Sequence, residues 1–585
     1  MIATAPTPAP DGPDGPDGPD ALDRSPLATP VTSVPLACAT VATLMRQGVC
    51  EVIVCAGARN AVLVAVLARS PGLRVWSFPE ERSAAFFALG RTVALAAPVA
   101  VVTTSGTAVA ELLPAAMEAY YQGLPLVLVT ADRPRAYRGT GAPQAVEQPG
   151  IFTTYAALCG DVATLEELAD FERVLAGWDH GCPIQLNVCL EEPTASDLAG
   201  AGGVSGVAAV ARPARAAVDP QPVLAFLADR AAGPLLAVVA ALPSGERDGV
   251  TRFLRRLGCP VFAEATSGLR ECPELARQLI HGGESALARQ PVGRVLRLGG
   301  IPSVRWWRDL EKQPAIRVLS LTSTGFPGLA RLSSVSGFPQ WDGLVASTDG
   351  GLLLSGLEAA GEDPETVRVE PEAAADAQTA ALMLHPHSEP ALIHALSSRL
   401  PHGALVFLGN SLPIREWNSF ATTWPRGLRC HANRGANGID GCLSTFLGLS
   451  ADEPESWAVI GDLTALYDLA ALWITPSLAP GRRRIVVINN GGGRIFSRVA
   501  ATRDLPPEQR QLMENPHALN FHGWAGMFGW AYVRVTAADD WTAALALEAT
   551  HAIIEVVPDD AATAAFWRLS SSMPSAEGAT AAPQS

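Results

Sequence analysis

The sequence predicts an α/β protein with three domains, each built on a parallel sheet flanked by helices. One reason is length, because 585 residues exceed what a single hydrophobic core serves and suggest three domains of ordinary size. Another is composition, since 48% hydrophobic and only 17% charged residues suit a large protein with buried parallel strands. The third is a rhythm in which apolar runs alternate with Ala-rich helical stretches, and this rhythm recurs in three blocks.

The first block predicts a domain at residues 35–195. An acidic Gly/Pro repeat precedes it, and the tail at 1–34 is expected to be disordered because such a segment cannot bury apolar surface. The predicted strands lie within residues 51–57, 98–106, 125–134 and 183–190. A helix is predicted at residues 106–123, between the second and third of these strands.

The central domain is predicted at residues 215–365, between linkers at 196–214 and 366–380 where the composition changes. Its strands are expected within residues 233–245, 259–267, 292–300 and 315–323. The third domain is predicted at 381–570, before a second disordered tail at 571–585. Its strands are expected within residues 403–411, 456–463, 483–493 and 551–560.

Charge and cysteine usage limit the possible partners. A formal charge of −15 argues against a nucleic-acid surface or an anionic membrane as partner, so any anionic substrate must be held by a local group of arginines. The ten cysteines have no CxxC pair or ligand-like spacing, which favours reduced thiols in the cytoplasm over a zinc site. No targeting segment or membrane span is recognisable, and a cytoplasmic location is expected.

Polar residues and glycines follow two strands of the third block. Asp462 and Asn490 are 28 residues apart, about one strand-helix-strand crossover, so both side chains should emerge at the same edge of one sheet. That edge is where open α/β sheets bind ligands, and a carboxylate with an amide suits Mg²⁺ and a diphosphate. Taken alone, Asp462 also fits a helix N-cap and the glycines after Asn490 fit a flexible turn, but the spacing favours a joint site.

An acidic pair in the first block is a second candidate. Glu80 and Glu81 follow a predicted strand and precede an apolar helix. Charge alone would favour a helix-capping role for this pair.

The motifs around these residues resemble known enzymes. The Gly-Asp-Leu at 461–463, followed after a crossover by Asn-Asn, resembles the diphosphate and magnesium signature of thiamine-diphosphate enzymes. The motifs EERSAAFFALG, VLVTADRP, GNSLPIREW, NRGANGIDG and NNGGGRIFS, in this order between about residues 52 and 535, resemble one family more specifically. That family is 2-succinyl-5-enolpyruvyl-6-hydroxy-3-cyclohexene-1-carboxylate synthase, and the resemblance implies the thiamine-diphosphate-binding fold.

The resemblance implies an activity and a set of cofactor residues. The family decarboxylates 2-oxoglutarate and adds the succinyl group to isochorismate by 1,4-addition, in menaquinone and phylloquinone biosynthesis, with thiamine diphosphate and Mg²⁺, or Mn²⁺ in its place. Glu81 corresponds to the carboxylate that activates the cofactor, and Ile439 to the apolar wedge beneath it. The remaining cofactor positions are Gly461, Asp462, Leu463, Thr464, Asn490 and Gly492, of which Asp462, Asn490 and the Gly492 carbonyl would hold the metal. The family is a homodimer or homotetramer with its sites at subunit interfaces.

The family's two substrates, 2-oxoglutarate and isochorismate, are polyanions, and the resemblance implies a group of residues that bind them. Arginine binds carboxylates through a planar fork and stabilises developing negative charge. The positions that correspond to the family's substrate site are Arg59, Arg133, Gln144, Arg305, Ser411, Arg415, Arg434, Ile495 and Phe496. With Glu81, the arginines Arg59 and Arg415 are the candidate catalytic residues.

Some positions depart from the family pattern and leave other interpretations open. Ala58 stands where the family usually has serine, Pro143 and Gly491 where it has asparagine, and Trp306 follows Arg305 in a stretch that is usually more basic. These changes bear on substrate affinity. The alternatives are another thiamine-diphosphate carboligase or decarboxylase of the acetolactate synthase type, and a non-catalytic protein of the same fold. A nucleotide-binding protein is disfavoured because no GxxxxGK[ST] loop is present.

Overall fold

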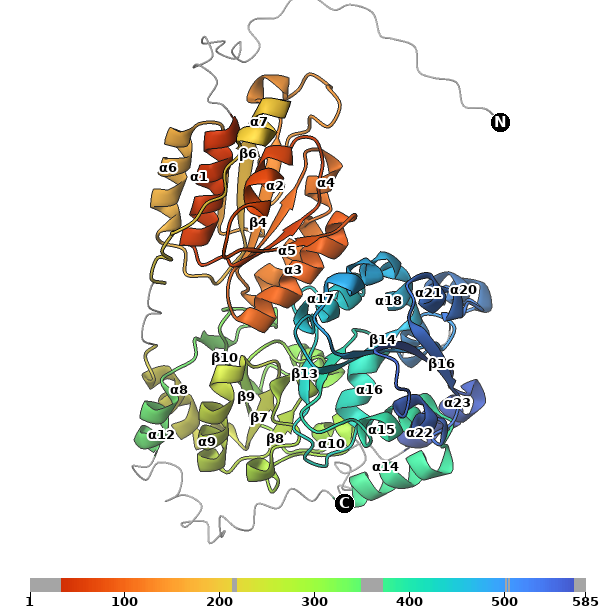
Figure 1. Cartoon of the computed structure of the whole chain (residues 1–585). Helices are drawn as coiled ribbons and strands as arrows, with labels where there is room; N and C mark the ends of the chain where they lie inside the picture. Colours follow the sequence, from red (N-terminus) through yellow and green to blue (C-terminus); the bar gives the residue numbers. More distant parts are fainter. Residues whose placement is uncertain (1–32, 213–217, 349–371, 500–501, 503–504, 573–585) are drawn as a thin grey trace, which may run out of the picture.

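The computed structural model describes residues 33–212, 218–348, 372–499, 502 and 505–572. Figure 1 shows three α/β units in which helices flank parallel sheets, which confirms the predicted fold class. Most of the two predicted disordered tails lies outside the described residues.

The first sheet has six parallel strands in the order β2-β1-β3-β4-β6-β5. Its strands are β1 (Glu51–Val54), β2 (Arg74–Ser77), β3 (Val99–Thr103), β4 (Leu126–Asp132), β5 (Leu158–Val162) and β6 (Ile184–Cys189). The helices of this unit are α1 (Ser33–Arg46), α2 (Ala61–Ala68), α3 (Glu81–Leu95), α4 (Thr107–Ala110), α5 (Leu113–Gln122), α6 (Leu165–Leu175) and α7 (Ala195–Gly200). Strands β3 and β4 are buried along their whole length, as expected for a sheet covered on both faces.

The central sheet has five parallel strands in the order β11-β10-β9-β7-β8. Its strands are β7 (Leu235–Val239), β8 (Val261–Ala263), β9 (Arg294–Leu298), β10 (Arg317–Leu321) and β11 (Ser334–Ser336). Its helices are α8 (Gln221–Ala228), α9 (Arg247–Leu257), α10 (Gly283–Ala288), α11 (Arg305–Asp309) and α12 (Trp341–Thr348).

The third sheet also has six parallel strands, in the order β13-β12-β14-β15-β17-β16. Its strands are β12 (Leu405–Leu408), β13 (Arg429–His431), β14 (Glu455–Gly461), β15 (Arg482–Ile488), β16 (Ala531–Val535) and β17 (His551–Val556). Its helices are α14 (Glu372–Leu384), α15 (Glu389–Ser397), α16 (Leu412–Phe420), α17 (Cys442–Leu449), α18 (Asp462–Tyr467), α20 (Pro507–Glu514), α21 (His522–Met527), α22 (Asp540–Leu545) and α23 (Asp560–Ser572).

Every strand predicted from an apolar run is present, and the strands that sequence patterns missed lie at sheet edges. These are β5, β11, β13 and β16. An edge strand is covered on fewer sides, so it needs no continuous apolar run, and most residues of these four strands are partly or fully exposed. The structure also places helix in the segments predicted as linkers, because α7 extends to Gly200 and α14 begins at Glu372.

The first and third units pack directly through α3 and α17 (Figure 1). Two glycines allow this close approach: a Cβ on Gly90 would lie 2.1 Å from the Thr445 carbonyl oxygen, and a Cβ on Gly448 would lie 2.1 Å from the Phe87 carbonyl oxygen. Beside this contact the buried Arg91 guanidinium forms hydrogen bonds with Glu51 at 2.7 Å, with the Gly448 carbonyl oxygen at 3.2 Å and with Asp452 at 2.7 Å. The two units of one chain are therefore joined by a helix contact and a buried charge network.

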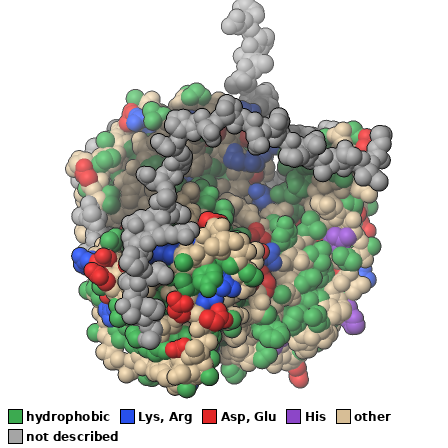
Figure 2. Space-filling view, turned by 90° about the horizontal axis from the view of Figure 1, so that it is seen from above, with side chains coloured by type: hydrophobic (Ala, Val, Ile, Leu, Met, Phe, Trp, Pro, Cys, Tyr) green, Lys and Arg blue, Asp and Glu red, His purple; other side chains and the backbone are tan. Residues whose placement is uncertain are grey.

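The surface is mixed in charge. On the face shown in Figure 2, acidic and basic side chains are interspersed with apolar ones. Among the described residues, no helix combines the length and the hydropathy needed to cross a bilayer.

Candidate active site

Asp462 lies at the carboxyl edge of the third sheet, as the first residue of α18 directly after β14. Its carboxylate accepts hydrogen bonds from the backbone N–H groups of Leu463 at 2.7 Å and Gly492 at 2.9 Å. The side chain is 2% exposed, and burial raises its pKa against the opposing effect of these hydrogen bonds. Gly461 before it is half-buried and Thr464 after it is buried. An ionised carboxylate here is held by backbone dipoles and is available to a cation.

Asn490 follows β15, the strand next to β14, so the structure brings the two predicted ligands to one edge. Its Nδ2 donates a hydrogen bond to Oε2 of Glu389 at 3.0 Å. Its Oδ1 is buried and has no hydrogen-bond partner among the described residues. An orphaned amide oxygen beside a held carboxylate is the donor set that a hard divalent cation requires.

The glycines after Asn490 adopt backbone that other residues rarely adopt. Gly491 has φ +78° and Gly492 has φ +132°, and a Cβ on Gly492 would lie 2.5 Å from the Glu514 carbonyl oxygen. The Gly492 carbonyl accepts the N–H of Arg494 at 2.8 Å. Glycine is needed here because the loop turns tightly against the segment around Glu514.

His517 is a residue at this site that the sequence interpretation missed. Its Nε2 lies 3.3 Å from Oδ2 of Asp462. It also lines a cavity of about 790 Å³ together with Asn490, Gly491 and Arg494. No strand-end or motif signal marks His517, because it lies in an irregular loop after α20.

The two glutamates at the start of α3 have different settings. Glu80 is the N-cap, and its carboxylate accepts the N–H groups of Arg82 at 3.0 Å and Ser83 at 2.9 Å. Both glutamates line a cavity of about 520 Å³ together with Gln144, but among the described residues no backbone cap contact to the following helix turn holds the Glu81 carboxylate. Burial, with smaller contributions from Glu80 and Glu111, raises the pKa of Glu81 against a backbone hydrogen bond that lowers it. The capping role therefore belongs to Glu80, which leaves Glu81 available for other contacts.

Arg415 and Arg434 lie near one another in the third unit. Burial lowers the pKa of Arg415, and the guanidiniums of Arg434 and Arg308 lower it further. Arg415 donates to the Ser411 carbonyl at 2.6 Å, and Ser411 has an unusual φ of 73°. Arg434 donates to Asn410 at 2.9 Å, while its Nε is buried with no hydrogen-bond partner among the described residues. The chain thus concentrates positive charge beside the strand ends of the third sheet.

A buried carboxylate of the central unit lies close to these two arginines. Glu264 is 1% exposed and accepts the N–H and the hydroxyl of Ser303, both at 2.6 Å. Its charge opposes the lowering of the pKa of Arg434. The central unit therefore supplies the counter-charge for the arginine group.

The predicted substrate residues of the first unit are separate from that group. Arg59 is buried and donates to the Leu190 carbonyl at 3.0 Å and to Glu192 at 2.6 Å. Arg133 is partly exposed and donates to the Pro143 carbonyl at 2.9 Å. Gln144, with φ 56°, lies in the cavity of Glu81.

The remaining predicted residues have more exposed settings. Arg305 is exposed, and its Nε lies 3.6 Å from Oδ2 of Asp309. Arg308 of the same helix α11 is a residue whose charge lowers the pKa of Arg415. Ile439 is partly exposed. Ile495 and Phe496 are partly exposed within the 3₁₀ helix Arg494–Arg498.

The loop that carries Arg434 and Ile439 is fixed by buried acids from two units. Glu118 of α5 is 2% exposed and accepts backbone N–H groups of residues 435–437 at 2.6, 2.7 and 3.2 Å. Asp468 is fully buried and accepts the N–H of Gly441 at 2.9 Å at the start of α17. No sequence pattern marks either residue, because each binds backbone that is far away in the chain. Glu118 lies 317 residues before Gly435, and Asp468 lies 27 residues after Gly441.

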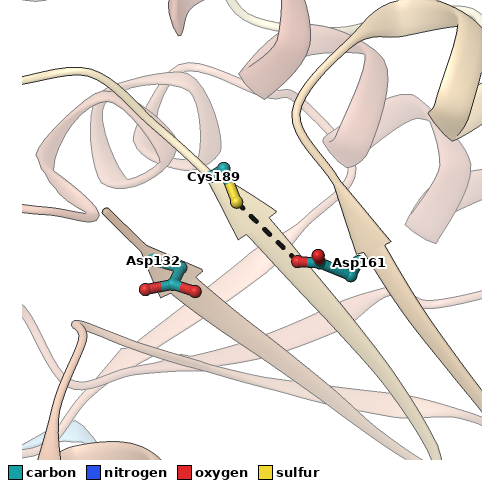
Figure 3. A group of neighbouring side chains, drawn as sticks. All are labelled: Asp132, Asp161 and Cys189. Carbon is teal, nitrogen blue, oxygen red and sulfur yellow. Dashed lines mark hydrogen bonds between the residues drawn. The ribbon is translucent and has the colours of Figure 1, made fainter. Parts of the chain in front are cut away.

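A group of acidic side chains at the ends of β4, β5 and β6 is bound by an arginine side chain of the same unit. Figure 3 shows Asp132, Asp161 and Cys189 facing one another. The Arg138 guanidinium donates to Asp132 at 2.8 Å and to Asp161 at 2.7 Å. Burial alone would raise the pKa of Asp161, but hydrogen bonds from Arg138 and Asn187 outweigh it and lower the pKa to about 2. The cluster is an arginine–carboxylate network rather than a candidate metal site.

Within the chain, the two halves of the predicted site occupy different cavities. The cavity of Glu81 and the cavity of Asn490 share no lining residue. A single described chain therefore presents Glu81 and Asn490 in separate cavities.

Comparisons with known proteins agree on the class of enzyme. Residues 36–151 match the family described as thiamine pyrophosphate enzyme, N-terminal TPP binding domain. A solved structure from Mycobacterium smegmatis, provisionally assigned as a thiamin diphosphate-dependent enzyme, superposes with a TM-score of 0.65 at 18% identity, covering 89% of this chain and 99% of that one. At that identity the similarity establishes the fold.

Curated relatives establish the family. The 2-succinyl-5-enolpyruvyl-6-hydroxy-3-cyclohexene-1-carboxylate synthase of Akkermansia muciniphila is 42% identical over 88% of this chain and 94% of its own length. The synthase of the same name from Bdellovibrio bacteriovorus is 40% identical over 92% of this chain and 98% of its own. The chain belongs to the 2-succinyl-5-enolpyruvyl-6-hydroxy-3-cyclohexene-1-carboxylate synthase family of thiamine-diphosphate-dependent enzymes.

Proposed function

We propose that the chain decarboxylates 2-oxoglutarate and adds the resulting succinyl group to isochorismate, in menaquinone or phylloquinone biosynthesis. The observation that carries this function is identity of 40–42% with synthases of that name over nearly the whole length of both chains. The enzyme is a thiamine-diphosphate-dependent transferase. When bound, this cofactor supplies the carbanion chemistry that the decarboxylation of a 2-oxo acid requires.

The cofactor's diphosphate would be held through Mg²⁺, or Mn²⁺ in its place, at the edge of the third sheet. Asp462 and Asn490 would provide side-chain oxygens and Gly492 its carbonyl. The fit is supported by the buried Oδ1 of Asn490, which lacks a partner among the described residues, and by the Asp462 carboxylate fixed by two backbone N–H groups. Gly461, Leu463 and Thr464 form the adjoining backbone of the predicted cofactor site.

Glu81 would hold a proton at the pyrimidine ring of the cofactor. Its raised pKa, caused mainly by burial, suits a carboxyl group that shares a proton at neutral pH. Ile439, on the loop fixed by Glu118 and Asp468, would provide an apolar contact beneath the ring.

The carboxylates of both substrates would be bound by arginines from different units. Arg415 and Arg434 concentrate charge beside the third sheet, with Ser411 at the start of the same helix as Arg415. Arg59, Arg133 and Gln144 of the first unit, Arg305 of the central unit and the apolar residues Ile495 and Phe496 complete the proposed substrate site. Removing water from around several guanidiniums strengthens their attraction for carboxylates.

The two halves of the site would meet across subunits of a homodimer or homotetramer. Support comes from the separate cavities of Glu81 and Asn490 within one chain. Large apolar side chains of the third unit are also exposed, with Tyr467 at 52%, Trp473 at 55% and Met527 at 78%. Exposed side chains of this size are typical of a surface that another subunit covers. The ten unpaired cysteines suit a reducing compartment, and we place the enzyme in the cytoplasm.

The direct test is a turnover assay. Purified protein is mixed with thiamine diphosphate, Mg²⁺, 2-oxoglutarate and isochorismate, and the loss of isochorismate is followed by its absorbance. We expect isochorismate to be consumed only when 2-oxoglutarate is present. Consumption of pyruvate in place of 2-oxoglutarate would favour an acetolactate synthase-like reaction. Binding of the cofactor without turnover of either 2-oxo acid would contradict the proposal.

A further inference from the structure

The two ends of the Asn490 side-chain amide have unlike surroundings. Its Nδ2 donates to Oε2 of Glu389 at 3.0 Å, and its Oδ1 is buried with no hydrogen-bond partner among the described residues. A rotation of the amide by half a turn would break the first contact and would place N–H groups where Oδ1 now lies. The contact with Glu389 therefore selects which end of the amide faces the edge of the sheet.

Glu389 is itself held in a fixed position. It is the first residue of α15, is followed by a proline and is 2% exposed. Its backbone N–H donates to the Thr563 hydroxyl at 3.0 Å, and the preceding Ser388 accepts the N–H of Ala391 at 3.4 Å as the helix N-cap. An acceptor on a capped helix start can hold a partner side chain in one orientation.

A second buried carboxyl group lies beside Glu389. Glu416 of α16 is fully buried and shares a side-chain hydrogen bond with Glu389, and the Arg498 guanidinium acts on both carboxyl groups. Among the described residues, no hydrogen bond joins Glu416 to Asn490. Glu416→Gln therefore provides a control, because Glu416 is as buried as Glu389 and glutamine keeps a hydrogen-bonding group beside Glu389 without changing the contact to the amide.

We propose that Glu389 is a positioning residue that orients the Asn490 amide so that Oδ1 faces the divalent cation. This inference rests on the proposed cation site of Asp462 and Asn490. Glu389 is assigned no contact with the cation or the cofactor, and it acts only through the asparagine. Without an acceptor at this position, the amide is free to present its N–H groups, which a cation repels. Loss of a residue that orients a metal ligand typically lowers metal affinity by about 10–100-fold.

The first test compares two substitutions at one position. Glu389→Leu removes the acceptor at similar volume, whereas Glu389→Gln keeps a carbonyl that accepts from Asn490. Mn²⁺ binding is titrated at saturating thiamine diphosphate, with free Mn²⁺ measured by electron paramagnetic resonance. We expect Glu389→Leu to weaken Mn²⁺ binding by about 10-fold or more, and Glu389→Gln and the control Glu416→Gln to stay within about threefold of the parent.

The second test exchanges the hydrogen-bonding roles of residues 389 and 490, so that residue 389 donates and residue 490 accepts. This test remains informative if Glu389→Leu fails to fold. Asn490→Asp places a carboxylate against the carboxylate of Glu389, so Mn²⁺ binding should weaken. Adding Glu389→Gln supplies an N–H that donates to the new carboxylate, and binding should recover by about 10-fold.

Distinct results would overturn the different parts of the argument. Equal Mn²⁺ affinity of folded Glu389→Leu and the parent, or no recovery in the double variant, would remove the positioning role while leaving the proposed function intact. If the parent itself binds no Mn²⁺ with thiamine diphosphate, both the cation site and the inference are wrong.

Discussion

The first and third sheets have the same strand order but different side chains at their carboxyl edges. The order β13-β12-β14-β15-β17-β16 is the order β2-β1-β3-β4-β6-β5 with every strand number raised by eleven. After its third and fourth strands the third unit has Asp462 and Asn490, where the first unit has Thr104 and Pro134 at the corresponding positions. After its second strand the first unit has Glu81, at the start of α3. One topology therefore carries two different halves of the proposed site.

The comparison shows that the fold determines where the strand-end side chains lie, whereas the residue types determine what those side chains can bind. Parallel strands bring their carboxyl ends to one edge, so any residue placed there is near its neighbours. Whether that edge binds a cation depends on oxygen ligands such as Asp462 and Asn490. The corresponding helices α3 and α17 pack together within one chain, and in that arrangement Glu81 and Asn490 line separate cavities.

The largest expected effect comes from breaking the third unit's half of the site. Asp462→Ala removes the carboxylate that two backbone N–H groups hold at the sheet edge. Calorimetric titration with thiamine diphosphate and Mg²⁺ should show cofactor affinity reduced by more than about 100-fold, since a direct ligand is lost. Asp539→Ala, which changes an exposed aspartate of the same unit, should bind normally. Normal cofactor uptake by Asp462→Ala would refute the cation site.

Disrupting the first unit's half of the proposed site should lower kcat more than it lowers the affinity for the cofactor. Glu81→Gln keeps the side-chain shape but removes the acid, so kcat should fall by about 10²–10⁴-fold while cofactor affinity changes little. Glu80→Gln is the matched control, because Glu80 acts as the helix N-cap and its amide oxygen can still accept a backbone N–H. Activity of Glu81→Gln equal to the parent would remove the role assigned to Glu81.

The same two variants test whether the halves come from different subunits. Purified Glu81→Gln and Asp462→Ala chains are mixed, dissociated and reassembled. If the halves meet across subunits, about half of the random dimers are mixed and each holds one intact site, so about a quarter of parental activity should return. If both halves come from one chain, no assembly contains an intact site. Absence of recovery from well-assembled dimers would therefore contradict the interface proposal.

A smaller effect is expected from the contact between the two corresponding helices. Gly90→Ala in α3 places a methyl group 2.1 Å from the Thr445 carbonyl oxygen in α17, so the helices must separate. Such overpacking typically costs about 1–3 kcal/mol of unfolding free energy. Gly343→Ala, in the exposed part of α12 with no atom near the added Cβ, should instead be neutral or stabilising. Urea unfolding of both variants measures the difference, and equal stability would show that the helices are not in close contact.

The sequence predicted the buried strands and strand-end motifs well, because both are local patterns. Apolar runs such as residues 485–488 and the polar residues that follow them lie next to each other in the chain. Contacts between distant segments left no such pattern. Glu389 begins an ordinary capped helix 101 residues before Asn490, and Glu118 lies more than 300 residues before the loop that it fixes. Edge strands such as β13 were missed because partial exposure removes the apolar run.

The smallest expected effect concerns the pH dependence of the two sheets. The strands of the first sheet contain no histidine, whereas the third sheet contains His431 in β13 and His551 in β17. Burial, followed by the guanidiniums of Arg247 and Arg429, lowers the pKa of His431 to about 4, and Glu453 opposes this shift. The folded state therefore binds fewer protons than the unfolded state between about pH 4 and 6.5. Stability from this group is present above that window and is lost as the pH falls through it.

His431→Gln should reduce the loss of unfolding free energy between pH 7 and pH 5. The reduction should be below about 2 kcal/mol, the limit for one group whose pKa in the unfolded chain is near 6.5. Urea unfolding at both pH values measures it, and His522→Gln, at an exposed position of the same unit, is the control. Hydrogen exchange locates the effect, since acid should open β13 before the strands of the first sheet. An unchanged pH dependence in His431→Gln would show that His431 takes up its proton equally in the folded and unfolded chains.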